Sequence, residues 1–507
     1  MDGSLNIPAL IQLIISLIDY AFIFFILFFE RKEATRRFAW IMILAFLPGV
    51  GIVLYLLFSG NFFAGTRSMK EINKYVHHLT EPLFEEQRTL LTSPEAQLPA
   101  AVSGEFHPLI MMNLERGNCP LITTDKPQLY VTGSDFFEDV CAHLEEAKTS
   151  ICMEYFIFHK DEIGKRIMDI LCRKAKEGVD VKLIYDDFGS ILTPTRFFKK
   201  LDQCGGRARP FYQIRLGLPL TLNHRNHRKL TVIDSQVAYV GGVNIGDEYA
   251  NQSKHRKLNW RDTVVRVSGD IVYDLQSRFL IDWYSMDAWH RRSKTEQKIE
   301  KYFPKERFGD IYKMHGKGSD LLSHGSLYTQ VLNAGPDDEH KGKIEDALIR
   351  MIMGAKKRVC IETPYFTPDE QFYTALKIAA YTGVKVDIII PRDWDKFFMK
   401  AASSEFARQA LRDGINIYLY PGFIHSKMLV ADQKICTVGT TNIDNRSFTL
   451  HFEQNIIFYD KSFSQKCQQM FEEDLSKSEA VTVNYYDKKN IFSRAFWSFC
   501  KLFSPFM

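Results

Sequence analysis

The sequence predicts an α/β protein in which two pseudo-symmetric lobes share one active site, preceded by an N-terminal transmembrane helical hairpin. Three observations lead to this prediction: two long apolar runs at the N-terminus, an internal repeat, and a polar motif that occurs once in each repeat. At about 100–200 residues per domain, the 507 residues suffice for several domains. A net charge of +4 weighs against a dedicated nucleic-acid binder, and 46% hydrophobic residues exclude wholesale disorder.

The two apolar runs predict a membrane hairpin over residues 1–60. Residues 7–29 and residues 38–58 each reach the roughly 20 residues that a helix needs to cross a bilayer, and the stretch between them is short and charged. A cleavable signal peptide would need a basic segment before the first run, and only MDGSLN precedes it. We therefore expect a multi-pass membrane anchor, followed by a connector over residues 61–120.

Basic residues leave the side of the membrane open. Those within residues 31–37 favour a cytoplasmic hairpin loop, whereas those within residues 67–74 favour the opposite orientation. The far end of the chain, residues 485–507, is rich in aromatic side chains and carries few charges near its end. This segment fits a helix lying in the membrane interface, and equally a helix docked on the protein core.

An internal repeat organises the rest of the chain. Residues 143–158 resemble residues 351–366, and residues 164–187 resemble residues 371–393. Each matched pair reads as an amphipathic helix followed by an apolar strand, which is typical of α/β lobes with helices covering a sheet. We expect one lobe over 121–300 and a second over 325–484, with the charged stretch 295–325 as the linker.

The same polar motif follows the third strand region of each half. The copies are HRKLTVIDSQVAYVGGVN at 227–244 and HSKMLVADQKICTVGTTN at 425–442, with histidine, lysine, aspartate, glycine and asparagine at identical spacings. In a chain with 14 histidines, the pattern H-x-K-x4-D is expected by chance only about 0.05 times. Two copies inside a larger repeat therefore indicate a functional motif.

Strand geometry predicts which motif residues gather on one face. Residues i and i+2 of an extended strand point to the same side, so His227 projects with Lys229, and His425 with Lys427. Folding each copy as a hairpin about its central turn sets the asparagine opposite the histidine, and the residue after the glycine opposite the lysine. The candidate phosphate-binding residues are therefore Asn244, Asn442, Gly242 and Thr440.

The aspartates of the motif sit at an odd offset from the histidines. Asp234 and Asp432 should therefore face away, and we expect them to hold local structure rather than do chemistry. The motif as a whole still defines the candidate catalytic set: His227, Lys229, Asp234, His425, Lys427 and Asp432.

These residue types suit chemistry on a phosphodiester. Lysines and amides supply positive charge and donors for phosphate oxygens and for the charge that develops in the transition state. One neutral histidine can attack phosphorus while a second, protonated histidine supplies the leaving alkoxide with a proton. The mechanism needs no cofactor and no metal, and the lysines would repel a cation.

Each histidine should have an acidic partner that fixes its tautomer. The candidates are Asp262 in NWRDTVV and Glu453 in LHFEQNI, each on the strand that follows its motif. Their parallel placement favours a histidine-orienting role over that of plain surface carboxylates.

At this point the sequence resembles the phospholipase D superfamily, whose signature is the duplicated H-x-K-x4-D motif, and within it the bacterial cardiolipin synthases. The similarity covers essentially the whole chain. The second copy reads GTTN where GSAN is more usual, and threonine keeps the hydroxyl. The matching stretches are the N-terminal spans, 223–249, 259–263, 363–372, 421–432 and 439–448.

The resemblance implies two phospholipase D-like lobes and a transfer between two lipids in a bacterial cell membrane. His227 would be the nucleophile and would form a phosphatidyl-histidine intermediate with one phosphatidylglycerol. His425 would protonate the departing glycerol and then deprotonate a hydroxyl of the second phosphatidylglycerol, which yields cardiolipin. Lys229, Lys427, Asn244 and Asn442 would hold the phosphate oxygens. The partners implied are membrane lipids, and the resemblance indicates no oligomeric state.

Three other functions were weighed against this one. A membrane-bound phospholipase D that hydrolyses phospholipid to phosphatidic acid would use the same residues, with water as the acceptor. A nucleic-acid phosphodiesterase is disfavoured by the apolar spans and the near-neutral charge. A non-catalytic membrane scaffold is disfavoured because both motif copies are intact.

Overall fold

The computed structural model describes residues 7–30, 34–59, 74, 84–85, 87–93, 102, 104–213, 223–254, 258–286, 327–336, 338 and 341–504. The contacts divide the chain into two compact units. One unit comprises Met1–Ala64 with Ile214–His224, and the main unit comprises Gly65–Gln213 with Arg225–Pro505. The expected linker over 295–325 lies outside the described residues, as do most of the residues of the expected connector before position 104.

The N-terminal unit contains three helices, α1 (Ile7–Phe28), α2 (Ala34–Phe46) and α3 (Val50–Phe58). Among the described residues, one helix is long and apolar enough to cross a membrane, over Pro8–Phe28. The expectation of a second continuous span over residues 38–58 was wrong, because this run is split into α2 and α3.

The break between α2 and α3 has a clear local cause. Pro48 has no backbone N–H to continue the helix, and Gly49 adopts a φ of 75°, which side chains disfavour. The amide of Gly49 donates a hydrogen bond to the buried carboxylate of Asp19 on α1, at 3.0 Å. The polar residue that interrupts the first apolar run thus satisfies the backbone at the break in the second.

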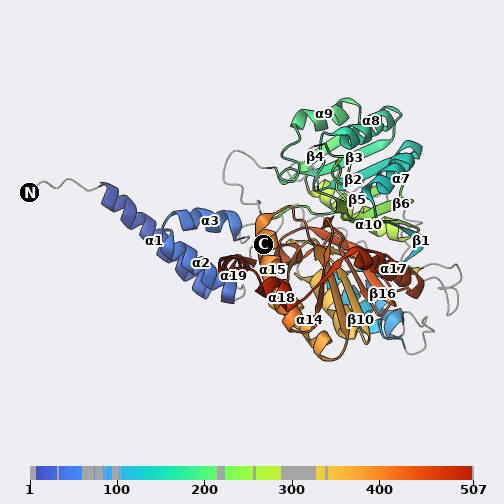
Figure 1. Ribbon diagram of the computed structural model, residues 1–507. Helices are drawn as coiled ribbons and strands as arrows, with labels where there is room; N and C mark the ends of the chain where they lie inside the picture. The colour runs from blue at the N-terminus through green and yellow to red at the C-terminus, as the bar shows by residue number, and fades with distance from the viewer. Residues whose placement is uncertain are drawn as a thin grey trace, which may run out of the picture. The chain divides into compact units, whose positions relative to one another are not determined.

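The main unit contains two lobes of similar order. Lobe 1 is preceded by α6 (His107–Gly117), and Figure 1 shows its helices α7, α8 and α9 in green and teal beside strands β2, β3 and β4. Its elements are β1 (Ile122–Tyr130), α7 (Gly133–Glu146), β2 (Ser150–Tyr155), α8 (Glu162–Lys176), β3 (Asp180–Asp186), α9 (Thr195–Gln203), β4 (Arg207–Phe211), β5 (Lys229–Ile233), β6 (Val237–Gly241), β7 (Trp260–Arg261), β8 (Val264–Ser268) and α10 (Ile271–Ser285).

Lobe 2 repeats the pattern and has three further elements at its end. Its elements are β9 (Leu327–Ala334), α13 (Lys343–Gly354), β10 (Arg358–Glu362), β11 (Phe366–Thr367), α14 (Glu370–Tyr381), β12 (Lys385–Pro391), α15 (Phe397–Arg412), β13 (Asn416–Tyr420), β14 (Phe423–Ile424), β15 (Met428–Ala431), β16 (Ile435–Gly439), β17 (Ile443–Asp444), α16 (Asn445–Thr449), β18 (Glu453–Phe458) and α17 (Lys461–Lys477), then β19 (Glu479–Val481), α18 (Val483–Asp487) and α19 (Ile491–Leu502).

The repeat is visible in how equivalent helices begin. Asp161 caps α8 by accepting a hydrogen bond from the amide of Gly164, and Asp369 caps α14 by accepting one from Phe372. Both helices then bury their apolar side against the sheet. The predicted order of helix and strand in these segments is therefore confirmed.

One mixed sheet of fifteen strands runs through both lobes, in the order β19-β13-β12-β10-β15-β16-β18-β9-β1-β8-β6-β5-β2-β3-β4. The lobes join where β1 pairs antiparallel with β9, from Ile122 opposite Thr329 to Thr124 opposite Leu327. A single buried apolar cluster then takes side chains from strands of both lobes and from α10 and α17. The two lobes therefore share a core as well as a sheet.

The register of the two motif hairpins differs by one residue from the expected one. Leu230 pairs with Val240, and Met428 pairs with Val438, so the asparagines do not lie directly opposite the histidines. The turn is the physical reason: its first two residues in each hairpin have positive φ, 53° and 55° at Asp234 and Ser235 and 53° and 58° in the second hairpin. Two left-handed residues set a tight primed turn that the motif spacing alone does not reveal.

Candidate active site

Each motif histidine is held by a segment of the opposite lobe. Strand β14, just before His425, pairs in parallel with β7, with Phe423 opposite Trp260. The amide of His425 donates to the carbonyl of Arg261 at 2.6 Å. In the other direction, the amide of His227 donates to the carbonyl of Phe452 at 2.9 Å. The backbone therefore interlocks the lobes beside both histidines.

Because the lobes interlock, each motif histidine pairs with a carboxylate of the opposite lobe. His227 Nδ1 of lobe 1 lies 2.9 and 3.1 Å from the two carboxylate oxygens of Glu453 in lobe 2. His425 Nδ1 of lobe 2 lies 2.6 Å from Asp262 Oδ2 in lobe 1. The two predicted orienting carboxylates are thus brought to the histidines, each to the histidine of the other motif copy.

The pairing fixes the chemistry of both rings. With Nδ1–H directed at a carboxylate, each imidazole keeps Nε2 as its reactive nitrogen. Burial, with help from Lys427, lowers the pKa of His425 to about 4. Burial and Lys229 lower the pKa of His227 well below its ordinary value. Both rings are therefore neutral before substrate binds, and a neutral imidazole is what a nucleophile requires.

The two motif lysines are buried, and each donates a hydrogen bond to the backbone carbonyl of the histidine in its own motif copy. Lys229 Nζ donates to the carbonyl of His227 at 2.6 Å, and Lys427 Nζ donates to the carbonyl of His425. Burial lowers the pKa of Lys229 to about 7 and that of Lys427 to about 8. A phosphate between the lobes would relieve this unfavourable burial of positive charge.

The motif aspartates lie away from the histidines, as their offset in the sequence predicted. Asp234 accepts hydrogen bonds from the amides of Lys148, Thr149 and Ser150 at 2.7–2.9 Å. Asp432 accepts three equivalent bonds from the amides of residues 356–358 at 2.7–2.8 Å. Each aspartate ties its turn to the start of the neighbouring strand, so neither has a carboxylate oxygen directed at the site.

The four candidate phosphate-binding residues occupy different surroundings. Asn244 uses both ends of its amide, accepting from the amide of Ile157 at 3.1 Å and donating to the Tyr249 hydroxyl at 3.0 Å. Asn442 is its counterpart, and its buried Oδ1 has no hydrogen-bond partner among the described residues. The amide of Asn244 is therefore already used within lobe 1, whereas the amide of Asn442 still has an atom without a partner among the described residues.

Thr440 and Gly242 lie against the orienting carboxylates rather than opposite the lysines as expected. The Thr440 hydroxyl donates to Glu453 Oε2 at 2.5 Å. A Cβ at Gly242 would meet Asp262 Oδ1 at 2.1 Å, so only glycine lets that carboxylate approach the strand. At these equivalent positions, glycine in lobe 1 leaves room for Asp262, and threonine in lobe 2 donates a hydrogen bond to Glu453.

Several polar residues around the site were missed by sequence reasoning. His451 is one: its ring lies 5.6 Å from the His227 ring, and its Nδ1 lies 3.8 Å from Glu453 Oε1. Buried ion pairs also support the site, Arg228 with Asp282 at 2.5 Å and Arg261 with Asp474 at 2.5 Å. Arg228 lies in the first motif copy, Arg261 precedes Asp262 in NWRDTVV, and His451 lies in LHFEQNI, so these three were within reach of the sequence.

His227, His451 and Glu453 present ligand atoms within 4.8 Å of one another, close enough to consider a metal ion. Two imidazoles and a carboxylate are a donor set that zinc accepts. However, Lys229 and Lys427 both lower the pKa of His227 by their charge and would repel a dication in the same way. The surroundings suit an anion better than a cation.

The chain is similar to known proteins over its full length. A family described as "Cardiolipin synthase, PLD-like domain" matches residues 140–283 and 348–475, and one described as "Phospholipase_D-nuclease N-terminal" matches residues 17–60. A cardiolipin synthase of Listeria innocua is 36% identical over 99% of this chain and 100% of its own length. Cardiolipin synthase 2 of Staphylococcus epidermidis is 36% identical over 97% of this chain and 96% of its own.

A solved structure shows the same fold at lower sequence similarity. The phosphatidylserine synthase of Haemophilus influenzae matches with a TM-score of 0.57 at 15% identity. The match covers 79% of this chain and 97% of that protein. At this identity the likeness supports the two-lobed fold alone.

Proposed function

The chain belongs to the cardiolipin synthase family and is a phosphatidyltransferase, and we propose that its two lobes form one site that joins two phosphatidylglycerol molecules into cardiolipin and glycerol. The observation that carries this proposal is the crossed arrangement in which each lobe orients the histidine of the other. Such a pair can serve one phosphorus atom from opposite sides, as a two-step displacement requires.

In the first step, Nε2 of His227 attacks the phosphorus of one phosphatidylglycerol. A P–N bond forms, the P–O bond to glycerol breaks, and His425 gives its Nε2 proton to the departing alkoxide. The negative phosphodiester raises the pKa of the nearby histidines, which allows the neutral His425 of the ligand-free enzyme to take up this proton when substrate binds. Burial raises the pKa of Glu453 to about 8, and the charge that His227 gains favours the ionised carboxylate, which stabilises that charge in turn.

In the second step, His425 works as the base. Its Nε2 takes the proton from a hydroxyl of the second phosphatidylglycerol, whose oxygen attacks phosphorus while the P–N bond to His227 breaks. Lys229 and Lys427 stabilise the extra charge on the phosphate oxygens in both steps. Asn442, whose Nδ2 donates to no residue that the structure describes, is a better candidate for a phosphate contact than Asn244, whose Nδ2 donates to the Tyr249 hydroxyl.

The remaining motif residues have supporting roles in this proposal. Thr440 and Gly242 position Glu453 and Asp262, and the motif aspartates Asp234 and Asp432 hold the turns. We assign the two functional domains to 121–300 and 325–484, the boundaries that the repeat predicts.

The protein is associated with the membrane, and we propose that the N-terminal unit anchors it there as a hairpin. Helix α1 supplies one span, and α2 with α3 supplies a broken second pass whose free amide at Gly49 is satisfied by Asp19. Anchoring keeps the site near a two-dimensional pool of lipid and helps to exclude water, the competing acceptor.

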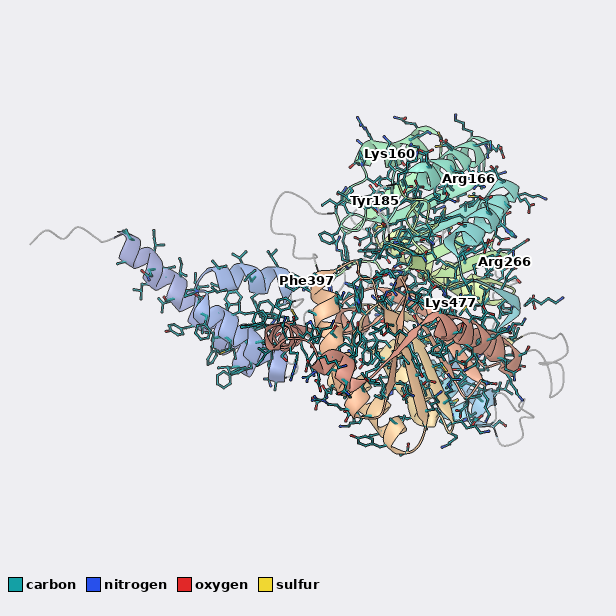
Figure 2. All side chains as sticks on the ribbon, viewed as in Figure 1. Lys160, Arg166, Tyr185, Arg266, Phe397 and Lys477 are labelled. Carbon is teal, nitrogen blue, oxygen red and sulfur yellow. The ribbon has the colours of Figure 1, made fainter. Side chains whose placement is uncertain are left out.

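We further propose that α19 lies in the membrane interface. Ile491, Phe492, Phe499 and Leu502 of this helix are 53–83% exposed, whereas Phe496 packs on Phe397 at the start of α15 with ring centroids 5.3 Å apart. Figure 2 labels Phe397, which is itself 68% exposed. One side of α19 therefore docks on lobe 2, and the other presents apolar side chains suited to lipid.

A product analysis tests the proposed function. The purified full-length protein is incubated with phosphatidylglycerol and excess EDTA, and the lipids are identified by mass spectrometry. Cardiolipin with an equal amount of glycerol is the expected result, and a His227→Asn variant should form neither. Phosphatidic acid without cardiolipin would mean that water is the acceptor, and loss of turnover with EDTA would point to a metal.

A further inference from the structure

Arg446 is a partly buried cation that the mechanism above does not use. It lies on α16, in the segment that follows the second motif copy. Its guanidinium makes no hydrogen bond or ion pair with any residue that the structure describes, and its Nε is completely buried. Burial lowers the pKa of Arg446, with Asp444 opposing and Arg225 adding to the shift. An unpaired buried charge is costly, and such a group usually has an anionic partner in the working protein.

The nearest charged residues do not provide that partner. Asp444 faces Arg446, but its Oδ1 accepts the amide of Ser447 as the cap of α16, at 2.7 Å. Arg225 is itself a cation, paired with the buried Asp186 at 3.3 Å. Neither neighbour takes up the N–H donors of the Arg446 guanidinium among the described residues, and these donors suit an anionic ligand.

Short backbone contacts connect this position to the active site. The carbonyl of Arg446 accepts from the amide of His451 at 2.9 Å, and the His451 ring lies 5.6 Å from that of His227. Arg225, the neighbouring cation, accepts at its carbonyl from the amide of Phe452, whose own carbonyl accepts from His227. The backbone of Arg446 is thus hydrogen-bonded to His451, the residue whose ring lies next to that of His227.

The fold does not require an arginine here. In the aligned motif copies, Glu248 follows His227 at the spacing at which Arg446 follows His425. Glu248 is paired within lobe 1, to His159 at 3.6 Å. The two motif copies agree at histidine, lysine, aspartate, glycine and asparagine. At this position, however, one copy has an acidic residue and the other a basic one, so the two halves of the site differ here.

We propose that Arg446 binds the phosphate of the acceptor phosphatidylglycerol, which is the phosphate that is not transferred. This inference rests on the proposed function. The product carries two phosphates on one glycerol, so a second anion must lie close to the phosphorus held by the histidines and motif lysines when the acceptor attacks. A guanidinium can hold such a phosphate through two parallel hydrogen bonds.

A competition between two acceptors tests this role. The enzyme is given phosphatidylglycerol together with deuterated glycerol, and both alcohols attack the same intermediate. Attack by glycerol gives deuterated phosphatidylglycerol, and attack by phosphatidylglycerol gives cardiolipin, so mass spectrometry yields a ratio of the two products. Only the second acceptor carries a phosphate.

Arg446→Met should lower the ratio of cardiolipin to deuterated phosphatidylglycerol by about tenfold or more, because it removes a charge-assisted contact to one acceptor alone. Arg446→Lys should lower it less. As a control, Arg266→Met removes an arginine that pairs with Asp139 away from the site and should keep the ratio of the wild type. The ratio is internal to each enzyme, so a partly unfolded preparation does not change it, and Arg446→Lys decides the question if the methionine variant fails to fold.

An unchanged ratio in the Arg446 variants, whatever their total rate, would overturn the assignment. Failure of the proposed function looks different. In that case the wild type itself makes no cardiolipin, while it exchanges glycerol or releases phosphatidic acid.

Discussion

Each motif histidine is paired with a carboxylate of the opposite lobe, so in the proposed mechanism the two carboxylates act on different steps. Glu453 supports His227, and Asp262 supports His425. A substrate with a good leaving group separates these roles, because a nitrophenolate departs without a general acid.

We predict that Glu453→Gln lowers the initial burst of nitrophenol from bis(p-nitrophenyl) phosphate by about 100-fold or more, because the nucleophile loses its orienting charge. Asp262→Asn should keep the burst within about tenfold of the wild type and then stall, because His425 is needed to activate the next acceptor. Stopped-flow absorbance measures both, with His227→Asn and His425→Asn as references. The reverse order of effects would mean that His425 is the nucleophile.

The depressed pKa of His425 also predicts how stability depends on pH. Burial, followed by the charge of Lys427, lowers this pKa from 6.5 to about 4. The unfolded chain therefore binds more protons between these values, so stability falls as pH falls through this window and is unaffected above it. The loss attributable to His425 is about 2 kcal/mol at about pH 5.

A comparison of wild type with His425→Asn checks this prediction. Urea unfolding in detergent at about pH 7.5 and about pH 5 gives the stability lost on acidification, and the variant should lose about 2 kcal/mol less. Equal losses in the two proteins would show that His425 is protonated in the folded enzyme.

At the residue scale, the sequence predicted which side chains lie near one another better than it predicted which of them pair. The repeat spacing identified both histidines, both lysines, Asp262 and Glu453. The crossing of the pairs could not be predicted, because the partners are 226 and 163 residues apart and meet only through the interlocked backbone. Arg446 gave no motif signal, since it becomes notable only when its burial without a partner is known.

At the element scale, the motif hairpins show what the aspartate of each motif copy holds in place. Asp234 and Asp432 each receive three backbone amides from the start of β2 or β10. The odd offset in the strand predicted this structural role. The one-residue difference in register escaped prediction, because it depends on two left-handed turn residues.

We predict that Asp234→Asn lowers the free energy of unfolding by about 2 kcal/mol, because the amide presents an NH2 group to backbone donors. The expressed yield should fall, while the kcat of the folded fraction stays within about threefold of the wild type. Asp432→Asn is the matched variant in the second lobe. Normal thermal stability combined with lost turnover in either variant would assign that aspartate to the chemistry.

Helix α19 has a testable role of its own. We predict that Phe492→Ser with Leu502→Ser lowers activity on phosphatidylglycerol vesicles severalfold more than activity on detergent micelles, because these exposed side chains would insert into a bilayer. Met353→Ser on α13, which is 44% exposed, is the control. An equal effect on vesicles and micelles would indicate that α19 serves only to cover lobe 2.

At the scale of the whole molecule, the lobes form one sheet, one shared core and one site. The composition and the repeat predicted the two α/β lobes, because helix and strand periodicities are local properties of the chain. The pairing of β1 with β9 was beyond sequence reasoning, since the residues between the lobes carry no pattern that sets which strands meet. The break in the second apolar run was missed because hydropathy counts length and ignores Pro48 and Gly49.

In the proposed function, one site built by both lobes transfers a phosphatidyl group through His227. The most direct measurement is to react His425→Asn with bis(p-nitrophenyl) phosphate, stop the reaction in base, and locate the adduct by peptide mass spectrometry. We expect one nitrophenylphosphoryl adduct per chain on His227, joined through a P–N bond and lasting because His425 is absent, and about 100-fold slower formation of this adduct when Glu453→Gln is added. An adduct on another residue, or nitrophenol release without any adduct, would contradict it.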